Sequence, residues 1–395
     1  MGTGKTSAAI NFINHAPKER RFLFVTPYLD EVHRIIEACP EKNFQEPKEM
    51  GSKKKGIIHL MKKGANIAST HSLFQTFTED MIAYIQAYNY TLILDEVTDV
   101  VETVNLSQRD RETLLDKYVQ MDEHGFLHWI DPEYSGRFED IQHQCDMGCL
   151  AMYGDTVLLW LFPVKVFAAF ESVYLLTYLF DGQPQRGYFD MYEVSYRRLY
   201  VVKCQSGAYQ FSETPPSYEL THYQELIHIC DDQKMNAIGS LVEGALSSTW
   251  YRKASDDVLR QLRNNIGNFC RNIMRCKSGQ VLWTTYSSAK QSLSGKGYAK
   301  GFLACNARAT NQYKDRTVLC YLVNWYMKPP IKKFFEQEGI RVDEDLYALS
   351  AMLQWIWRSA IRENREIWLY LPSVRMRRLL ETWLGQQTAA ARKAA

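Results

Sequence analysis

The sequence predicts an α/β protein in which helices cover both faces of parallel sheets in a doubly wound arrangement. Three observations lead to this fold class. Short apolar runs alternate with stretches of helical periodicity over the first half of the chain, as in parallel sheets buried on both faces. A glycine-rich turn leads directly into the first predicted helix. The chain has 395 residues, more than one simple core accommodates, so we expect two domains.

The first half of the chain alternates predicted strands with predicted helices. The strands are Phe22–Thr26, Ile67–Thr70, Leu92–Asp95 and Val173–Thr177. The helices are Ser7–His15, Asp30–Cys39 and Leu73–Tyr88. Residues Asn105–Asp155 are richer in polar and turn residues, so we expect an insertion there that contains one helix, Gln108–Val119.

A run of turn-forming residues, Phe180–Gly187, is typical of an interdomain connection. We therefore predict domains at residues 1–180 and 181–387, followed by an alanine-rich tail at 388–395. The second domain repeats the α/β pattern less clearly. Its predicted strands are Leu199–Lys203, Gln280–Thr285, Thr317–Val323 and Glu366–Leu371, and its predicted helices are Leu346–Arg362 and Arg375–Leu384.

The composition is typical of a globular protein of the cytoplasm. Hydrophobic residues make up 46% and aromatic residues 13%, which argues against disorder. Nine cysteines are scattered without a signal peptide before them, which indicates a reducing compartment. Cys145 and Cys149, with His128 and His143, fit no standard zinc spacing. The apolar stretch Val157–Phe180 is interrupted by proline and charged residues, so we expect buried α/β core rather than a membrane span.

Two short motifs carry the predicted chemistry. The first, Met-Gly-Thr-Gly-Lys-Thr, occupies residues 1–6, and the second is the apolar run Leu92–Glu96. In such a pattern, backbone N–H groups at a helix N-terminus cradle phosphates, Lys5 reaches the β- and γ-phosphates, and the Thr6 hydroxyl binds Mg²⁺. Asp95 supplies the other magnesium contact, and Glu96 places a carboxylate beside the attacking water. Together the motifs predict a nucleoside-triphosphate site.

The start of the first motif is unusual. The full P-loop pattern has a glycine five residues before Gly4 and a strand before the loop, and the sequence contains neither. We therefore expect the first domain to lack its N-terminal strand, because of a missing upstream segment or because a partner chain supplies it.

These two motifs belong to a longer series of segments that occur in a fixed order. They are Gly2–Thr6, Thr26–Pro27, Ser69–His71, Asp95–Asp99, Leu175–Phe180, Ala307–Arg316 and Gln354–Arg362. This series resembles motifs I, Ia, Ib, II, III, V and VI of superfamily 2 helicases, especially the helicase-like ATPases of phages and prophages. The resemblance extends from Gly2 to about Ser373. In Leu175–Phe180, the segment that resembles motif III, only Thr177 matches the family pattern.

The resemblance implies two RecA-like P-loop domains that use ATP and Mg²⁺ to move along nucleic acid, with DNA favoured over RNA. The nucleotide contacts that it implies are Gly2, Thr3, Gly4, Lys5, Thr6 and Gln354, with Thr6 and Asp95 holding Mg²⁺. The catalytic residues that it implies are Lys5, Asp95, Glu96, Arg358 and Arg362. The nucleic-acid contacts that it implies are Thr26, Ser69, Thr70, Arg308 and Thr310.

Arg358 and Arg362 are four residues apart, whereas the general helicase pattern places two arginines three apart. Positions four apart are neighbours on a helix face, so either arginine could serve as the finger that stabilises transition-state charge. The alternative is surface salt bridges with Glu363 or Glu366, which contribute only about 0–1 kcal/mol.

A lysine cluster in the first domain is the candidate for a local nucleic-acid surface. Six lysines and one acid, Glu49, lie between Lys48 and Lys63, although the net charge of the chain is only +2. We expect Gly51–Gly56 to form a flexible basic loop whose lysines, Lys53, Lys54 and Lys55, contact phosphates. The alternative is a solvated loop that keeps the protein soluble.

Three functions agree with the sequence. The first is an ATP-dependent helicase or translocase of phage or prophage DNA metabolism. The second is a terminase-type packaging ATPase, whose nuclease domain needs converging acids. Its candidates are Asp231, Asp232, Asp256, Asp257, Asp343 and Asp345. The third is a degenerate ATP-binding partner protein without motor activity, which the unusual start of the chain suggests.

Overall fold

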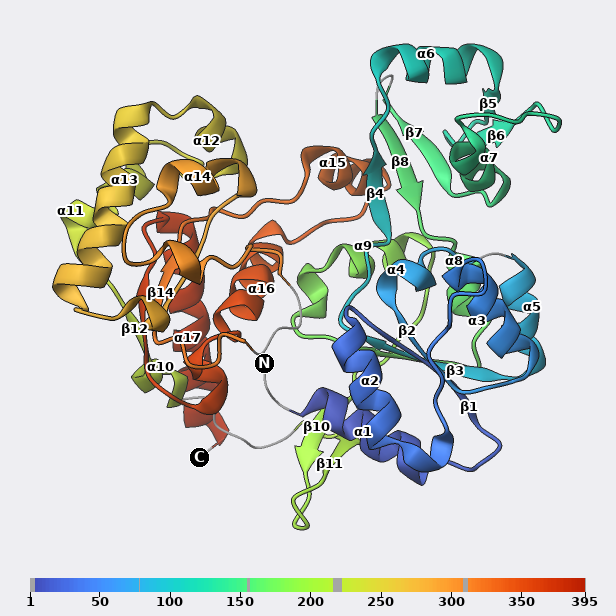
Figure 1. Cartoon of the computed structure of the whole chain (residues 1–395), viewed down its shortest axis with the longest axis horizontal. Coiled ribbons are helices and arrows are strands. Elements are labelled where there is room, and N and C mark those ends of the chain that lie inside the picture. Colours follow the sequence, from blue (N-terminus) through green and yellow to red (C-terminus); the bar gives the residue numbers. More distant parts are fainter. Residues whose placement is uncertain (1–3, 78, 155–156, 216–221, 308–311, 395) are drawn as a thin grey trace. The chain divides into compact units, whose positions relative to one another are not determined.

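Figure 1 shows a computed structural model of the chain, which describes residues 4–77, 79–154, 157–215, 222–307 and 312–394. The chain divides into two compact units. We call residues 4–215 with 328–342 the N-terminal unit, and residues 216–327 with 343–395 the C-terminal unit. The predicted boundary at 180/181 differs from this division because helix α9 (Pro184–Met191) packs against α15 (Pro329–Gln337), where Gly187 faces the Phe335 ring.

The N-terminal unit is built on a parallel four-stranded sheet, as the continuous apolar runs predict. The order is β2-β1-β3-β9, with β1 (Arg21–Thr26), β2 (Ile67–Thr70), β3 (Tyr90–Asp95) and β9 (Ser172–Leu176). All three strand pairs are parallel. The register pairs Thr26 with Thr70, and Asp95 with Leu176. The carboxyl ends of all four strands therefore meet at one edge of the sheet, which is where ligands bind in open α/β folds.

Helices cover both faces of this sheet (Figure 1). Phe22 and Phe24 pack on one face against Ala9 and Ile13 of α1 (Lys5–His15) and Val32 of α2 (Leu29–Ala38). The intervening residues of β1 turn to the other face because side chains alternate along a strand. The helices of this unit are α1 (Lys5–His15), α2 (Leu29–Ala38), α3 (Lys53–Lys62), α4 (His71–Phe74), α5 (Glu79–Ala87) and α8 (Val164–Ala168), besides α9 and α15. The single helix predicted over residues 73–88 is thus divided between α4 and α5.

The predicted insertion forms a small antiparallel region with its own core. Its sheet has the order β4-β8-β7, with β4 (Val101–Val104), β8 (Val157–Leu161) and β7 (Leu150–Tyr153). A hairpin of β5 (Val119–Met121) and β6 (Leu127–Trp129) and the helices α6 (Gln108–Lys117) and α7 (Glu139–Asp146) complete it. Leu114, Leu127, Phe138, Ile141 and Leu158 are buried together at its centre.

The C-terminal unit contains a second parallel sheet of order β12-β15-β14-β13, which confirms the predicted α/β class for both halves. The strands are β12 (Ile227–Ile229), β15 (Ile367–Tyr370), β14 (Val318–Tyr321) and β13 (Val281–Thr284). The helices are α10 (His222–Leu226), α11 (Gln233–Asn236), α12 (Ser248–Lys253), α13 (Asp256–Asn268), α14 (Lys290–Leu293), α16 (Glu344–Ile356) and α17 (Val374–Ala394). The side chains of α12, α13 and α14 pack on one face, and Trp355 of α16 contacts Tyr321 on the other.

The elements of the second half differ from the predicted ones in three details. The strand predicted at 199–203 is β10 (Tyr200–Lys203), which pairs antiparallel with β11 (Tyr209–Ser212) in the N-terminal unit and joins neither parallel sheet. The helix predicted over 346–362 ends at Ile356. Helix α17 continues through the predicted tail as far as Ala394.

Within the described residues, no helix has both the length and the apolar character that a membrane crossing requires. The apolar stretch Val157–Phe180 instead forms β8, α8 and β9, as predicted.

The packing of the C-terminal unit can be tested at Gly239, which lies in a 3-10 turn, η3 (Ala237–Ser240). A β-carbon there would come 1.7 Å from the carbonyl oxygen of Pro372. We expect Gly239→Ala to lower the free energy of unfolding by about 1–3 kcal/mol, because backbone must move. Gly385→Ala, in the exposed part of α17 with nothing within 4 Å, should raise it by up to about 1 kcal/mol. Urea unfolding of both variants checks this, and equal effects would contradict the packing.

Candidate functional site

The N-terminus of α1 is shaped by Gly4. Gly4 has φ of +78°, in the left-handed region that favours glycine, and its carbonyl accepts the first helical hydrogen bond from Ala8. A β-carbon on Gly4 would lie 2.4 Å from the ring of Tyr209 in β11. The turn therefore requires glycine for its backbone conformation and also for the close approach of Tyr209. It leaves the first N–H groups of α1 available to an anion, because helix N-termini have unpaired donors.

Thr6 and Asp95 come together although 89 residues separate them. Asp95 is the last residue of β3, and Thr6 is in the first turn of α1. The Thr6 hydroxyl lies 3.3 Å from Oδ2 and 3.5 Å from Oδ1 of Asp95. The predicted pairing of a helix-start hydroxyl with a strand-end carboxylate is thus present as a direct contact. One hydroxyl and one carboxylate oxygen are a donor set that suits Mg²⁺, which completes its shell with phosphate oxygens and water.

Lys5 lies in the electrostatic field of the same acids. Burial lowers the pKa of the Lys5 ammonium, and the carboxylates of Asp95 and Glu96 oppose that shift. Burial also raises the pKa of Asp95 to about 7, with the charge of Glu96 adding to the shift, while Lys5 and the Thr6 hydroxyl oppose it. One partly buried cation next to two acids is a strongly perturbed cluster, as is typical of functional sites.

Glu96 is held in an unusual backbone conformation. Its φ is +65°, in the left-handed region, which costs a non-glycine residue about 1–2 kcal/mol. Its N–H donates a hydrogen bond to the Leu176 carbonyl at 3.1 Å, which ties the end of β3 to the end of β9. Strain of this kind is common at functional sites because the surrounding structure maintains it. The Asp95-Glu96 turn is therefore fixed by the sheet.

Sequence reasoning missed two residues of this site. His71, the first residue of α4, is buried, and its Nε2 lies 2.9 Å from the backbone oxygen of Asp95. Because a carbonyl only accepts, Nε2 carries the proton in this contact. His71 is the last residue of the segment Ser69–His71, but the sequence assigns it no role of its own. Tyr209 lies in the second predicted domain, whereas the nucleotide motifs lie in the first. No local sequence pattern predicts the contact of His71 with Asp95 or that of Tyr209 with Gly4, because each joins residues that are distant in sequence.

The pKa of Asp95 predicts a pH dependence of stability for the nucleotide-free protein. Its folded-state pKa of about 7 exceeds the ordinary value of 3.8, so this group's stabilising contribution is complete below pH 3.8 and is lost as the pH rises through about 7. Asp95→Asn removes this loss. At pH 8 the variant should therefore be more stable than wild type, on the order of 1–3 kcal/mol. Urea unfolding from pH 4 to 8 with a metal chelator measures it, and parallel curves for the two proteins would contradict the assignment.

The hydroxyls predicted to contact nucleic acid lie at the same edge of the sheet. Thr26 ends β1, and Ser69 and Thr70 end β2. Thr26 is fully buried and Ser69 is 2% exposed, whereas Thr70 is partly exposed. The Thr26 and Ser69 hydroxyls have no hydrogen-bond partner among the described residues. Their nucleic-acid role stays a prediction, as does that of Arg308 and Thr310, which lie outside the described residues, like Gly2 and Thr3.

The lysine cluster does not form the flexible loop predicted at residues 51–56. Lys53, Lys54 and Lys55 are the first turn of α3, and Ser52 caps this helix by accepting a hydrogen bond from the Lys55 N–H at 3.2 Å. The apolar residues Ile57 and Leu60 anchor the helix to the core. Lys53 lies 3.5 Å from Glu46 in an exposed ion pair.

The two candidate arginines belong to the C-terminal unit and do not share a helix face, so that prediction was wrong. Helix α16 ends at Ile356 because the Ala360 N–H bonds to the Arg316 carbonyl instead of continuing the helix. Arg358 follows in the turn and is 7% exposed, while Arg362 is exposed in a 3-10 turn, η8 (Ala360–Glu363).

The structure also places Gln354 and the two acids that were candidates for salt bridges with these arginines. Gln354 is partly buried on α16. Glu363 forms ion pairs with Lys314 and Arg365, and Glu366 pairs with His228. The nucleotide contact of Gln354 and the finger role of either arginine stay predictions.

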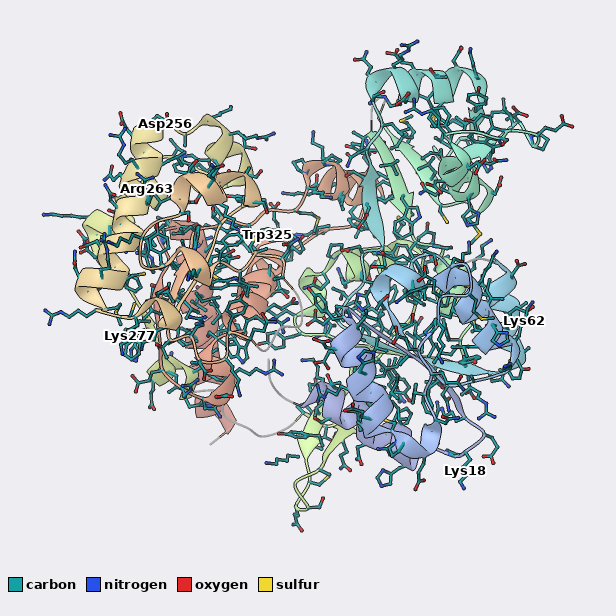
Figure 2. All side chains as sticks on the ribbon, viewed as in Figure 1. Lys18, Lys62, Asp256, Arg263, Lys277 and Trp325 are labelled. Atoms are coloured by element: carbon teal, nitrogen blue, oxygen red, sulfur yellow. The ribbon has the colours of Figure 1, made fainter. Side chains whose placement is uncertain are left out.

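Several of the acids proposed for a nuclease make structural contacts. Asp232 and Asp343 accept hydrogen bonds that cap α11 and α16, and Asp345 pairs with Arg375 at 2.8 Å. Asp256 begins α13 on an exposed surface (Figure 2). Across the parts of the chain that the structure describes, no group of three or more His, Cys, Asp or Glu side chains is placed to hold a metal ion.

The fold and the site define an α/β protein with two parallel sheets and an anion-accepting helix N-terminus beside a strand-end Asp-Glu pair. The chain belongs to the YonV family. It is 41% identical over 403 residues to the SPbeta prophage-derived protein YonV of Bacillus subtilis (strain 168), and the match covers 98% of this chain and 97% of that protein. Two family domains match separately, the YonV middle domain at residues 101–160 and the YonV C-terminal Rossmann-like domain at residues 221–384.

Two solved structures are also similar to this chain. The chain named XPD_APO has a TM-score of 0.47 at 12% identity and matches over 91% of this chain and 90% of its own length. The chain named XPD_Helicase has a TM-score of 0.45 at 11% identity and matches over 99% of this chain and 93% of its own length.

Proposed function

We propose that this protein is an ATP-dependent nucleic-acid translocase or helicase. One observation carries the proposal: the Thr6 hydroxyl meets the Asp95 carboxylate at the N-terminus of α1, with the partly buried Lys5 in the field of the same acids. A hydroxyl, a carboxylate and a cation at a helix N-terminus are the groups needed to hold a magnesium-bound triphosphate. The prophage origin of the related YonV supports a role in phage nucleic-acid metabolism.

In this proposal each residue of the N-terminal unit has a defined task. The N–H groups of α1 and the Lys5 ammonium bind phosphate oxygens, and Lys5 neutralises charge that develops on the leaving phosphate. Thr6 and Asp95 would hold a magnesium ion, which would supply positive charge to the phosphates when bound. Glu96 orients the attacking water and accepts its proton. The hydrogen bond from His71 to the Asp95 carbonyl keeps the strand end in place.

The ion needs Asp95 in its charged form. A raised pKa in the nucleotide-free protein means that the carboxyl is partly protonated near pH 7. Binding of a magnesium-bound nucleotide should therefore release a proton, as metal binding to protonated ligands does. Calorimetric titrations in two buffers of different ionisation enthalpy would detect this release.

The first turn of α3 supports the nucleic-acid part of the proposal. Three consecutive lysines at a helix N-terminus oppose the helix dipole, at a cost of about 0.3–1 kcal/mol each. An arrangement that breaks a local rule is often found where function requires it. A phosphate backbone lying across these lysines would balance their charge.

The proposal is tested by ATP hydrolysis with and without a single-stranded oligonucleotide. We expect phosphate release that requires magnesium and rises several-fold with the oligonucleotide. Magnesium-dependent ATP binding without any turnover would instead support a partner protein without motor activity.

The lysine turn makes a separate quantitative prediction. Replacing Lys53, Lys54 and Lys55 with alanine should reduce the slope of log affinity against log salt by about 2, because each neutralised phosphate of a single strand contributes about 0.7. Three exposed lysines elsewhere, Lys117, Lys234 and Lys296, provide a charge-matched control set. Fluorescence anisotropy with a labelled oligothymidylate at several salt concentrations measures the slopes. If both triple variants have the same slope of log affinity against log salt, the lysines of α3 do not contact the nucleic acid.

A further inference from the structure

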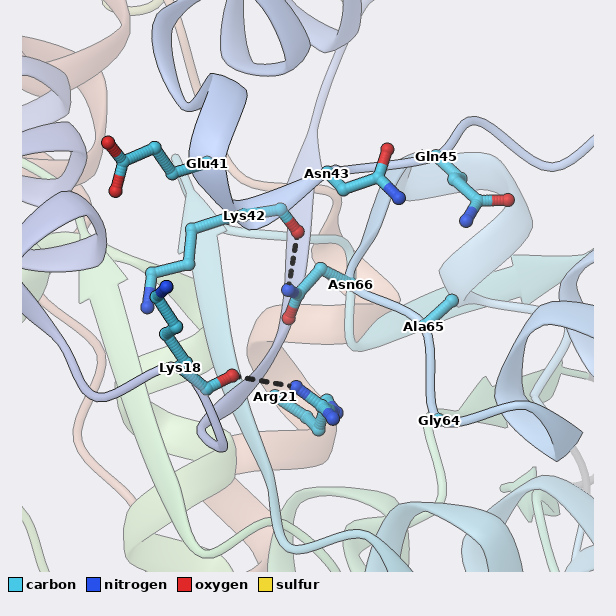
Figure 3. Close-up of a pocket in the computed structure, with 9 residues that line it drawn as sticks. All are labelled: Lys18, Arg21, Glu41, Lys42, Asn43, Gln45, Gly64, Ala65 and Asn66. Atoms are coloured by element: carbon cyan, nitrogen blue, oxygen red, sulfur yellow. Dashed lines mark hydrogen bonds between the residues drawn. The ribbon is translucent and has the colours of Figure 1, made fainter.

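A cavity of about 230 Å³ lies at the amino ends of β1 and β2 (Figure 3). Its walls come from the segment before β1, from residues 41–45, and from the segment before β2. Asp95 lies at the opposite, carboxyl edge of the same sheet. The six residues of β1 separate the two edges by about 20 Å, at about 3.3 Å per residue. The cavity is therefore distinct from the candidate nucleotide site.

The charge of this cavity is unbalanced. Lys18, Arg21 and Lys42 line it, against one acid, Glu41. Among the described residues, none of the three cations has a carboxylate oxygen within 4 Å. Lys42 is buried, whereas Lys18 is exposed and Arg21 is partly exposed. Because a buried charge is normally paired, the excess of cations around Lys42 favours binding of an anion.

Lys42 is the cation of this cavity that the surrounding structure holds in place. It is only 6% exposed, and its ammonium donates hydrogen bonds to the carbonyls of Ala16 at 2.6 Å and Pro17 at 2.8 Å. These carbonyls follow the C-terminus of α1, where a cation is favourable. Two of the three ammonium hydrogens are thereby used, and one remains. Burial lowers the pKa of Lys42 and the Arg21 guanidinium lowers it further, although the carboxylates of Glu19 and Glu41 oppose the shift. An anion would relieve both effects.

The remaining wall is rigid and carries further donors. Asn66 is buried, accepts a hydrogen bond from the Phe22 N–H at 2.7 Å and donates one to the Lys42 carbonyl at 2.7 Å. This pair of bonds fixes the loop of Lys42 to the start of β1. The side-chain amides of Asn43 and Gln45 also line the cavity. Amide and ammonium donors around a small volume are suited to oxygen atoms of a phosphate.

We propose that this cavity binds a phosphate group, through Lys18, Arg21 and Lys42. Its volume is smaller than the roughly 300–1,000 Å³ of sites for larger ligands, which fits a free phosphate or pyrophosphate. A phosphodiester of a nucleic-acid strand presents the same chemistry at the mouth. The proposal goes beyond the proposed function, since it needs neither Lys5 nor Asp95.

The test uses the full chain with Lys5→Ala, so that phosphate binding at the candidate nucleotide site is suppressed. Pyrophosphate and a short oligothymidylate serve as the two probes, each titrated by calorimetry at constant ionic strength. Lys18→Ala and Arg21→Ala remove cations that are not buried, so folding should be retained. Lys117→Ala, at an exposed position of the inserted region, removes the same charge elsewhere.

We expect saturable pyrophosphate binding in the Lys5→Ala protein, at least tenfold weaker after Lys18→Ala or Arg21→Ala and unchanged after Lys117→Ala. Binding of the oligothymidylate alone, with the same sensitivity to the variants, would identify a phosphodiester as the source of the phosphate. Absence of binding by both probes would overturn the proposal. Equal affinity in all variants would overturn it as well, because it would show general charge attraction.

Discussion

Lys5→Ala is expected to reduce kcat/KM for ATP by at least 100-fold, which corresponds to about 2.7 kcal/mol of transition-state stabilisation. The Lys5 ammonium is buried beside Asp95 and Glu96, so its removal leaves two acids facing the position of the phosphates. Rates of phosphate release measure the effect, with Lys117→Ala as the control for loss of a lysine. Activity within threefold of wild type would show that Lys5 does not meet the phosphates.

The same variant has a second readout that does not need turnover. Lys5 holds the pKa of Asp95 below the value that burial and Glu96 would otherwise give it. Its removal should therefore move the pH-dependent loss of stability to higher pH. A variant that is inactive but keeps the wild-type pH profile would indicate a fault elsewhere in the fold.

Glu96→Gln is expected to separate binding from hydrolysis. A general base contributes about 10²–10⁴ in rate, so kcat should fall by that factor. Glutamine has the same size and occupies the same left-handed backbone position, so affinity for ATP should change by less than about threefold. Single-turnover hydrolysis and equilibrium ATP binding are the two measurements. Asp95→Asn offers the matched contrast, because it should weaken magnesium-dependent binding itself.

A Glu96→Gln protein that hydrolyses ATP at the wild-type rate would assign the base to another residue. Loss of both binding and hydrolysis would instead show that Glu96 shapes the turn. Glu96 has a strained φ, and its N–H bonds to the Leu176 carbonyl. If the substitution disturbs this turn, the variant should therefore also lose thermal stability.

The parallel sheets could be predicted because their strands are apolar along their whole length. The strand that carries Asp95 runs Tyr-Thr-Leu-Ile-Leu-Asp, and the residues before Asp95 are fully buried. The nucleotide-site residues could be predicted because Gly4-Lys5-Thr6 and Asp95-Glu96 are contiguous groups at element ends. Parallel topology brings those ends to one edge without further information.

Other features depend on contacts that no local pattern encodes. The three residues of β12 are too short to be recognised as a strand before β15 pairs with them. The end of α16 depends on the Arg316 carbonyl, 44 positions before Ala360. The phosphate cavity combines three separate segments of sequence. The helix that begins at Lys53, by contrast, could have been predicted from local sequence. Ser52 is a suitable N-cap, and Ile57, Leu60 and Met61 have the spacing of a buried helix face.

The proposed activity requires a magnesium-bound triphosphate that contacts Lys5, Thr6 and Asp95. Its most direct test is a calorimetric titration of ATP into the wild-type protein, with magnesium and then with a chelator in its place. We predict saturable binding with magnesium, at least tenfold weaker with the chelator and in Asp95→Asn. Absence of saturable binding at millimolar ATP, or equal affinity in all three titrations, would contradict the account.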